Sequence, residues 1–218
     1  MKPFLSIVLV AGLTLLPGPI AAQHARLFPP QDLGLLEGPD RDAYQRPDQI
    51  MDALLIGEGS TVADLGAGGG WFTVRLARRV GPNGRVYAED IQPEMIGAIE
   101  RRVEREGLQK VVKTVLGTPT DPKIPAGSLD AVLIVDAYHE MEQPVTLLRN
   151  VAKSLKPTGM IGIVNYKKDG AGGPGPKLEE RVEPEQVIRD ARAAGLELRK
   201  REHFLRYQYL LTFGPAPK

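Results

Sequence analysis

The chain has 218 residues, of which 42% are apolar and 25% are charged, as in a folded domain that buries a core; this composition excludes a disordered or polytopic membrane protein. It contains 28 Lys and Arg and 27 Asp and Glu, so no strong net charge attracts nucleic acid or anionic lipid. It contains no cysteine, which excludes disulfides, thiolate metal ligands, a cysteine nucleophile and a lipid-modified N-terminal cysteine.

The N-terminal segment has the layout of a secretory signal peptide. Lys2 precedes an uncharged run at 4–16, and the small pair Ala21-Ala22 follows it. We therefore expect residues 1–22 to be a leader that is cleaved after Ala22 and exports the chain to the periplasm or the outside. The alternative is an uncleaved anchor through residues 3–20, which is short for a helix that spans a bilayer and would be the only contact with a membrane.

The rest of the chain divides into an arm and one domain. Residues 23–46 combine several prolines and glycines with charges and are expected to form an irregular N-terminal arm. Residues 47–218 then alternate helical and strand patterns. Helices are predicted from Pro47, with Ile50, Met51, Leu54 and Leu55 on one face, and over 71–80, 93–106, 144–155 and 185–194. Strands are predicted over 61–65, 85–89, 111–116, 129–135, 160–165, 196–204 and 207–213, the last two joined by Leu205-Arg206.

This order predicts an α/β fold with a doubly wound, mainly parallel seven-stranded sheet and an antiparallel C-terminal edge hairpin. The almost wholly apolar run 129–135 suits a strand that is covered on both faces. Open sheets of this kind bind ligands where the carboxyl ends of the strands meet.

A glycine-rich turn follows the first predicted strand. Asp64 ends the strand, and Gly66, Gly68 and Gly70 alternate after it. A glycine turns the backbone sharply and lets a ligand lie directly on the main chain, since it has no Cβ. Trp71 stands where a dinucleotide-binding fingerprint needs glycine, and no Gly-Lys-Ser/Thr follows, so both common phosphate-gripping loops are disfavoured.

A second acid ends the next strand. Asp90 lies twenty residues beyond Gly70, and a carboxylate there can accept two hydrogen bonds from a ribose diol. Either acid alone is equally compatible with a turn or helix-capping role. Asp64 and Asp90 together, one βαβ unit apart, favour a nucleoside pocket.

The pattern Asp64-x-Gly66-x-Gly68-x-Gly70, then Asp90-Ile91-x-Pro93-Glu94-Met95, then Leu155-Lys156-Pro157-x-Gly159, resembles the class I S-adenosylmethionine-dependent methyltransferases, from about residue 47 to 213. The resemblance implies that S-adenosyl-L-methionine is the methyl donor. It implies that the turn Gly66–Gly70, with Ala67, lies along the methionine and ribose and that Asp64 holds the methionine amino group. It further implies that Asp90 binds the ribose hydroxyls and that Ile91 packs against the adenine.

One segment departs from the family pattern. Where the family has a short acid-plus-alanine step that contacts adenine, this chain has Gly117-Thr118-Pro119. Proline has no N–H to donate, so Thr118, Thr120 or Asp121 is expected to supply the missing hydrogen bond.

Candidate chemistry follows the most apolar strand. His139 suits a general base because its ordinary pKa is near neutrality, and Tyr138 or Glu140 can position an acceptor, while Asp136 can touch the cofactor. Each has a structural alternative: His139 bonding a backbone carbonyl, or Glu140 capping the next helix. The three histidines have no metal-ligand spacing, and no metal site is predicted.

Two further segments are candidates for covering the pocket. The Gly- and Pro-rich loop 167–177 is either a lid or a linker. Tyr44 and Arg46, in the arm, either close the site or form a solvated helix entry. The sequence as a whole favours methyl transfer by in-line displacement to an unidentified small-molecule acceptor, with no nucleic-acid partner. The alternative is an exported, non-catalytic binding module that retains the methyltransferase fold.

Overall fold

The computed structural model describes residues 27–169 and 173–216. The predicted leader, residues 1–22, lies outside the described residues. Within them, no helix combines the length and the apolar character that crossing a membrane requires.

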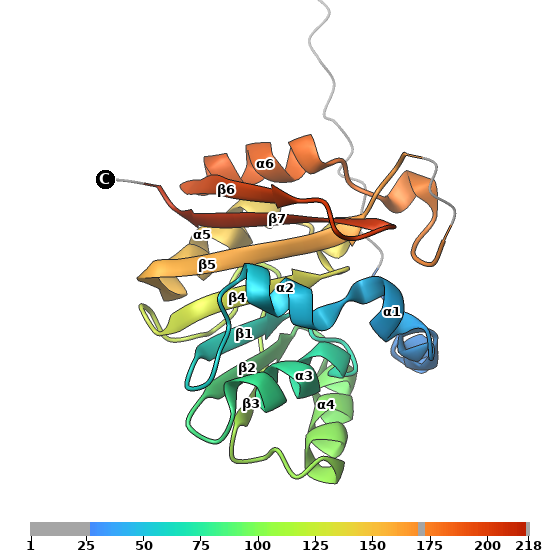
Figure 1. Ribbon diagram of the computed structural model, residues 1–218, viewed down its shortest axis with the longest axis vertical. Helices are drawn as coiled ribbons and strands as arrows, with labels where there is room; N and C mark the ends of the chain where they lie inside the picture. Colours follow the sequence, from blue (N-terminus) through green and yellow to red (C-terminus); the bar gives the residue numbers. More distant parts are fainter. Residues whose placement is uncertain (1–26, 170–172, 217–218) are drawn as a thin grey trace, which may run out of the picture.

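A seven-stranded sheet with the order β3-β2-β1-β4-β5-β7-β6 forms the centre of the molecule (Figure 1). Its strands are β1 (Thr61–Leu65), β2 (Arg85–Asp90), β3 (Val112–Leu116), β4 (Leu129–Val135), β5 (Leu155–Tyr166), β6 (Leu196–Glu202) and β7 (Gln208–Pro215). All neighbours pair in parallel except β7, which runs antiparallel to both β5 and β6. The predicted fold is therefore confirmed, and β7 lies inside the sheet between β5 and the edge strand β6.

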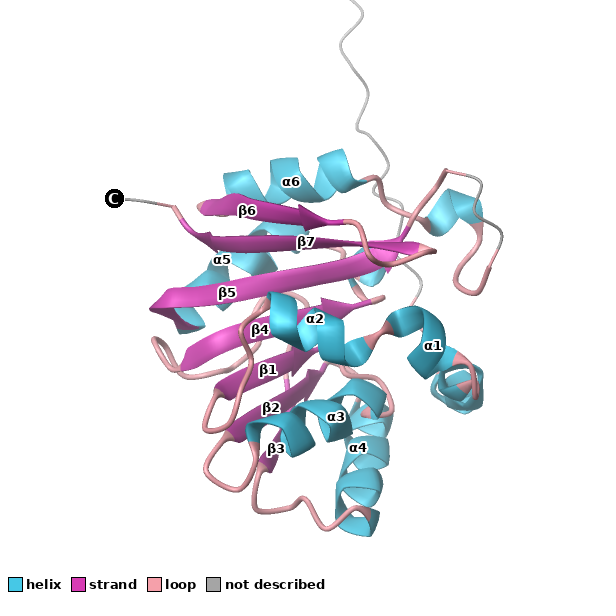
Figure 2. Ribbon diagram, viewed as in Figure 1, coloured by secondary structure: helices cyan, strands magenta, loops and turns pink. Residues whose placement is uncertain are grey.

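Helices cover both faces of this sheet (Figure 2). The helices of the described residues are η1 (Pro30–Glu37, a 3-10 helix), α1 (Arg41–Gln45), α2 (Pro47–Ala53), α3 (Trp71–Val80), α4 (Pro93–Arg105), η2 (Tyr138–Glu140, 3-10), α5 (Pro144–Ser154), η3 (Leu178–Glu180, 3-10) and α6 (Pro184–Ala193). A proline begins α2, α4, α5 and α6. Proline suits the first helical turn because its fixed φ is helical and its missing N–H would have no partner there.

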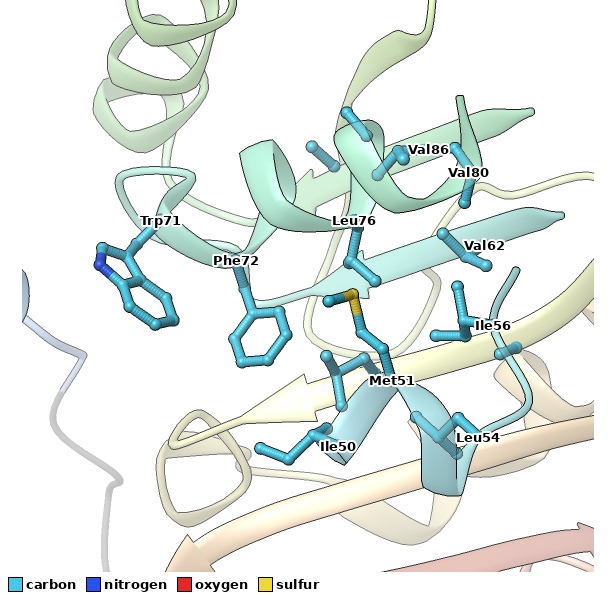
Figure 3. Close-up of a cluster of buried hydrophobic side chains, with 14 of the residues drawn as sticks. Ile50, Met51, Leu54, Ile56, Val62, Trp71, Phe72, Leu76, Val80 and Val86 are labelled. Atoms are coloured by element: carbon cyan, nitrogen blue, oxygen red, sulfur yellow. The ribbon is translucent and has the colours of Figure 1, made fainter. Parts of the chain in front are cut away.

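Two hydrophobic clusters hold the layers together. The first packs α2, α3 and α4 on one face of the sheet, with Met51 and Leu76 meeting Val62 of β1 (Figure 3). The second packs α5 and α6 on the other face, where Ala63 contributes instead. Successive residues of β1 thus belong to opposite clusters, as the two-residue period of a strand requires. Both faces are buried, which explains the almost wholly apolar run of β4, in which Asp130 is the one charged residue.

The structure corrects several predicted details. The arm is not irregular, because η1 and α1 occupy much of it. Leu55 is 82% exposed with a φ of 54°, since α2 ends at Ala53 and the chain turns there. The link between the last two strands is longer than two residues, because β6 already ends at Glu202. α1 lies beyond the end of the sheet toward which β1, β2 and β4 point (Figure 1).

Candidate functional site

A cavity of about 1270 Å³ lies at the carboxyl ends of β1, β2 and β4. The arm and the connection between β5 and α6 complete its walls. Of the residues predicted from sequence, it is lined by Asp64, Gly66, Ala67, Gly68, Asp90, Ile91, Asp136 and His139. Tyr44 and parts of the 167–177 loop, namely Lys168 and Pro174 to Lys177, also line it.

The glycine turn depends on its glycines for two physical reasons. Gly66, Gly68 and Gly70 have φ values of 70°, 55° and 76°, in the left-handed region that side chains disfavour. A Cβ on Gly66 would also lie 2.6 Å from the Cβ of Ala137, which follows β4. The turn can therefore approach β4 closely only with glycine at this position.

Asp64 is buried at the floor of the cavity. Its Oδ2 accepts a hydrogen bond of 2.6 Å from the Thr73 hydroxyl of α3. Burial raises its pKa to about 6, and the Thr73 hydrogen bond and the positive charge of Arg41 oppose that rise. One carboxylate oxygen is thus held by the protein, and the other is available to a cation in the cavity.

Asp90 is fixed by backbone donors from two loops. Its Oδ2 accepts from the Gly68 N–H at 2.9 Å, and its Oδ1 accepts from the Gln92 N–H at 3.0 Å. Burial raises the pKa of Asp90, against these hydrogen bonds. Each oxygen retains a lone pair, so the carboxylate can still accept two hydroxyl groups from a ligand.

Glu89 precedes Asp90 and also lines the cavity, although the sequence did not single it out. Its Oε1 has no hydrogen-bond partner within the described chain, and its Oε2 lies a long 3.4 Å from the Gly66 N–H. Burial, with the neighbouring Asp90 charge, raises its pKa to about 8. A buried acid with one long hydrogen bond and no opposite charge beside it is held mainly in its neutral form at pH 7.

Asp136 follows β4 with a φ of 54°. Gln208 of β7 donates from Nε2 to both of its carboxylate oxygens at 2.8 Å. Gln45 of α1 donates to the Gln208 amide oxygen at 3.0 Å, and Arg41 donates to Gln45 at 3.3 Å. This buried chain of hydrogen bonds joins the arm to the end of β4. Burial raises the pKa of Asp136 to about 6, opposed by the Arg41 charge and by Gln208.

Arg41 is the main residue that sequence reasoning missed. It is 9% exposed, lines the cavity, and lowers the pKa values of Asp64 and Asp136 through its charge. Its guanidinium donates to the Leu36 carbonyl at 2.6 Å and makes no ion pair within the described residues. No sequence signal identifies it, since it lies in a segment whose composition favours loops. Only the packing of α1 over the sheet end brings it to the cavity.

His139 and Glu140 follow β4 and also line the cavity. Burial lowers the pKa of His139, so its imidazole is neutral at pH 7. Its Nε2 lies 3.7 Å from Glu140 Oε1. Glu140 Oε2 accepts the backbone N–H of Phe28 at 2.8 Å, which fastens the arm across the cavity, and burial raises the Glu140 pKa to about 7.

Three predicted site residues lie elsewhere. Tyr138 is buried in the cluster on the other face of the sheet and donates from its hydroxyl to Asp190 at 2.8 Å, so its placement corrects the assignment to catalysis. Gly70 precedes α3 and faces Ile99 of α4 rather than the cavity. Thr118 closes a turn with Asp121, and only the neighbouring Pro119 lines the cavity.

The remaining candidates are also placed. Arg46 donates to the Phe204 carbonyl at 2.7 Å and does not line the cavity, so it joins the arm to the β6–β7 loop. Thr120 and Asp121 lie outside the lining too. No group of three or more metal-ligating side chains is assembled within the described residues.

The fold and this cavity define a class of protein. A parallel sheet with β7 inserted, a glycine turn after β1 and an acid after β2 place the chain in the class I S-adenosylmethionine-dependent methyltransferase superfamily. A model of the methyltransferase domain matches residues 62–159. This range contains the glycine turn, Asp90 and His139.

Individual relatives agree with this assignment. The chain is similar to an uncharacterized methyltransferase of Mycobacterium tuberculosis, with 34% identity over 64% of this chain and 55% of that protein. It is also similar to a demethylmenaquinone methyltransferase of Geobacillus stearothermophilus, with 29% identity over 51% and 47%. The chain thus spans about half the length of the curated relatives it matches. The structure resembles that of an S-adenosylmethionine-dependent methyltransferase from Aquifex aeolicus, with a TM-score of 0.81, 26% identity, and coverage of 86% of this chain and 98% of that one.

Proposed function

We propose that this protein transfers a methyl group from S-adenosylmethionine to a small-molecule acceptor. One observation carries the proposal: Asp90 and the glycine turn line the same cavity, and the Gly68 N–H of the turn holds the Asp90 carboxylate. Because the turn has no large side chains, a ligand can lie directly on its main chain. The cofactor, when bound, supplies an electrophilic methyl group on a sulfonium. The protein's own residues have to bind it, exclude water and receive the acceptor.

The side chains of the cavity fit this cofactor. Asp90 has two lone pairs left for the ribose hydroxyls, and Ile91 lies next to it to pack on the adenine. The free oxygen of Asp64 is available to the methionine ammonium. Arg41, a buried guanidinium without an ion pair in the described chain, would bind the methionine carboxylate. The charges of the amino-acid end are thus matched by residues of opposite sign.

The cavity also has room for an acceptor. Ligand pockets commonly measure roughly 300–1,000 Å³, and this one measures about 1270 Å³. The arm crosses it, fastened by Glu140 to the Phe28 N–H and by Gln92 to the Phe28 carbonyl. Such a cover excludes water and suits a small acceptor rather than a polymer.

His139 is the residue we assign to the acceptor. Its imidazole lines the cavity and is neutral at pH 7 because burial lowers its pKa. A neutral imidazole can take the proton from an acceptor hydroxyl or amine as the new bond to carbon forms. Alignment of acceptor, methyl and sulfur supplies much of the remaining rate acceleration.

We also propose that the protein acts outside the cytosol, on the strength of the Lys2-led apolar segment and the small pair Ala21-Ala22. Fractionation of producing cells, with sequencing of the mature N-terminus, tests this. A new N-terminus at Gln23 in the exported fraction supports it, and an intact Met1 in the cytosol contradicts it.

Calorimetry with S-adenosylmethionine and with its demethylated product tests the main proposal. Both are expected to bind, and Asp90→Ala is expected to weaken both by about tenfold or more, since it removes an acceptor of charged hydrogen bonds. Asp130→Asn is the matched control, because Asp130 also accepts a backbone N–H, that of Thr61, at the opposite end of the sheet. Absence of binding to the wild-type protein refutes the proposal. Binding without methyl transfer to any compound of a broad acceptor panel supports the non-catalytic binding module instead.

A further inference from the structure

A second buried guanidinium lines the cavity. Arg181 follows η3 in the connection between β5 and α6 and is 8% exposed. No carboxylate of the described residues lies within ion-pair distance of it. Burying a charge without an opposite charge is unfavourable, so an unpaired guanidinium facing a cavity points to a ligand of negative charge.

The protein satisfies only part of the donor capacity of Arg181. Its Nε donates to the Pro176 carbonyl at 3.0 Å, and its Nη1 donates to the Lys167 carbonyl at 2.8 Å. A guanidinium has five N–H groups, so three remain: both on Nη2 and one on Nη1. These N–H groups remain available to the oxygens of an anion in the cavity. The two carbonyls fix the orientation of the group in advance.

The topology separates Arg181 from the proposed cofactor site. Lys167 follows β5, which pairs with β4 on the side away from β1 and β2. Asp90 and the glycine turn belong to β1 and β2. The Arg181 guanidinium lies 5.4 Å from the centroid of the Tyr166 ring, which also lines the cavity. Arg181 is therefore on the wall that faces an acceptor rather than the adenosyl group.

The surroundings narrow the kind of anion. The lining of the cavity also includes the apolar residues Met141, Leu147, Pro174, Pro176 and Val182. Acids are numerous around the cavity, including Glu140, Glu179, Glu180 and Asp136, and the positive charge of Arg181 opposes the rise in the Asp136 pKa. A single negative charge is compatible with this mixture, whereas a dianion such as a phosphate monoester would be repelled by the acids.

From these observations we propose that Arg181 binds the carboxylate of the methyl acceptor, and that the acceptor is a small, mainly apolar carboxylic acid. This rests on the proposed function, because it assigns the acceptor end of the same cavity. The proposal requires no new chemistry. It adds a group that orients the acceptor while His139 faces the atom to be methylated.

Calorimetry on the complete protein saturated with the demethylated cofactor tests this directly. The probes are benzoate and hexanoate, each paired with its neutral amide, and phenyl phosphate. We expect at least one acid to bind about tenfold or more tightly than its amide, and Arg181→Gln to remove that preference. Arg189→Gln is the matched control, because Arg189 also lines the cavity but is exposed, and it is expected to keep the preference.

The outcomes are separable from those of the proposed function. Cofactor binding is measured first, and its absence refutes the proposed function itself. With the cofactor bound, equal affinity for every acid and its amide, or an acid preference that survives Arg181→Gln, overturns the assignment. Tighter, Arg181-dependent binding of phenyl phosphate overturns the choice of a carboxylate. A purely structural role of Arg181 would lower thermal stability without changing the ratio of acid to amide affinity, and this result too would overturn it.

Discussion

The guanidinium of Arg41 lies 4.2 Å from the centroid of the Trp71 ring. Arg41 belongs to α1 in the arm, and Trp71 is the first residue of α3, directly after the glycine turn. Arg75 stacks on the same ring at 3.4 Å. A cation–π contact of this kind stabilises a guanidinium that has been buried away from water. The contact also holds the arm against the glycine turn.

We predict that Arg41→Gln weakens binding of the demethylated cofactor by about tenfold or more, because it removes the partner of the methionine carboxylate. Binding of 5′-methylthioadenosine, which lacks the amino-acid group, is expected to be unchanged. Titration calorimetry of both ligands measures the two effects.

Arg75→Gln is the control for this prediction. Arg75 stacks on the same ring but forms an ion pair with Asp42 at 2.7 Å and does not line the cavity. It is expected to change neither affinity. Equal losses for both ligands in the Arg41 variant would show that Arg41 acts on the fold of the arm and not on the carboxylate.

Gly66→Ala is predicted to destabilise the protein and to abolish measurable cofactor binding. The substitution combines a left-handed φ of 70° with a contact of 2.6 Å to the Ala137 Cβ. Gly107→Ala separates the two causes, since Gly107 has a φ of 68° with no atom within 4 Å of its added Cβ. We expect Gly107→Ala to cost about 1 kcal/mol of stability and to leave binding intact. Thermal denaturation and calorimetry provide the measurements; equal behaviour of the two variants would contradict the close approach of the turn to Ala137.

His139→Ala is predicted to lower turnover by about a hundredfold or more while leaving cofactor affinity unchanged, because a general base acts on the acceptor alone. Burial lowers the pKa of His139, so wild-type turnover is expected to fall only when the pH drops below the ordinary value of 6.5. The acidic limb of the pH profile of kcat should be absent in the variant.

Two variants check the His139 prediction. His203→Ala removes an exposed histidine and is expected to leave turnover unchanged. Tyr138→Phe removes the hydrogen bond to Asp190 and should lower stability by about 1 kcal/mol with full turnover. A large loss of turnover in Tyr138→Phe would restore that residue to the chemistry.

The raised pKa of Glu89 predicts how the free energy of unfolding of the ligand-free protein depends on pH. Burial raises its pKa from 4.5 to about 8. An acid whose pKa is raised by folding stabilises the folded state fully below its unfolded pKa, and that contribution is lost as the pH rises through the folded pKa. The free energy of unfolding should therefore fall as the pH rises from about 5 to 8.5.

Glu89→Gln is expected to flatten this dependence, since a neutral amide does not titrate. Asp64 and Asp136, with pKa values raised to about 6, contribute to the slope at lower pH and remain in the variant. Denaturant titrations at several pH values, with exposed Glu94→Gln as the matched control, measure the difference. An unchanged slope in Glu89→Gln would mean that Glu89 is not desolvated in the folded protein.

Much of the fold could be predicted because it depends on local patterns. The apolar run of β4 and the prolines that begin four helices are present in the sequence. The strand bounds agree to within five residues, and the largest difference is at β5, which begins at Leu155 rather than at 160. Leu55 was placed wrongly because a helical pattern does not show where the helix ends. The position of β7 between β5 and β6 depends on pairing between distant segments.

In the cavity, too, some residues could be predicted from local sequence and others could not. The glycine turn and Asp90 could be recognised because their function needs particular residue types at a fixed spacing. Alternation does not indicate Glu89, because the two-residue period of β2 groups it with exposed Arg85 and half-buried Tyr87. Tyr138 could not be separated from His139 by sequence, since only the turn after β4 sends one ring into the core and the other toward the cavity.

By itself, the sequence determined the class of fold and the positions of the glycine turn and Asp90, because short-range spacing encodes both. The tertiary structure alone decided which charges meet in the cavity. Arg41 and Arg181 reach it from segments with no motif, since the packing of these segments over the sheet end and hydrogen bonds to three backbone carbonyls fix where their guanidinium groups lie.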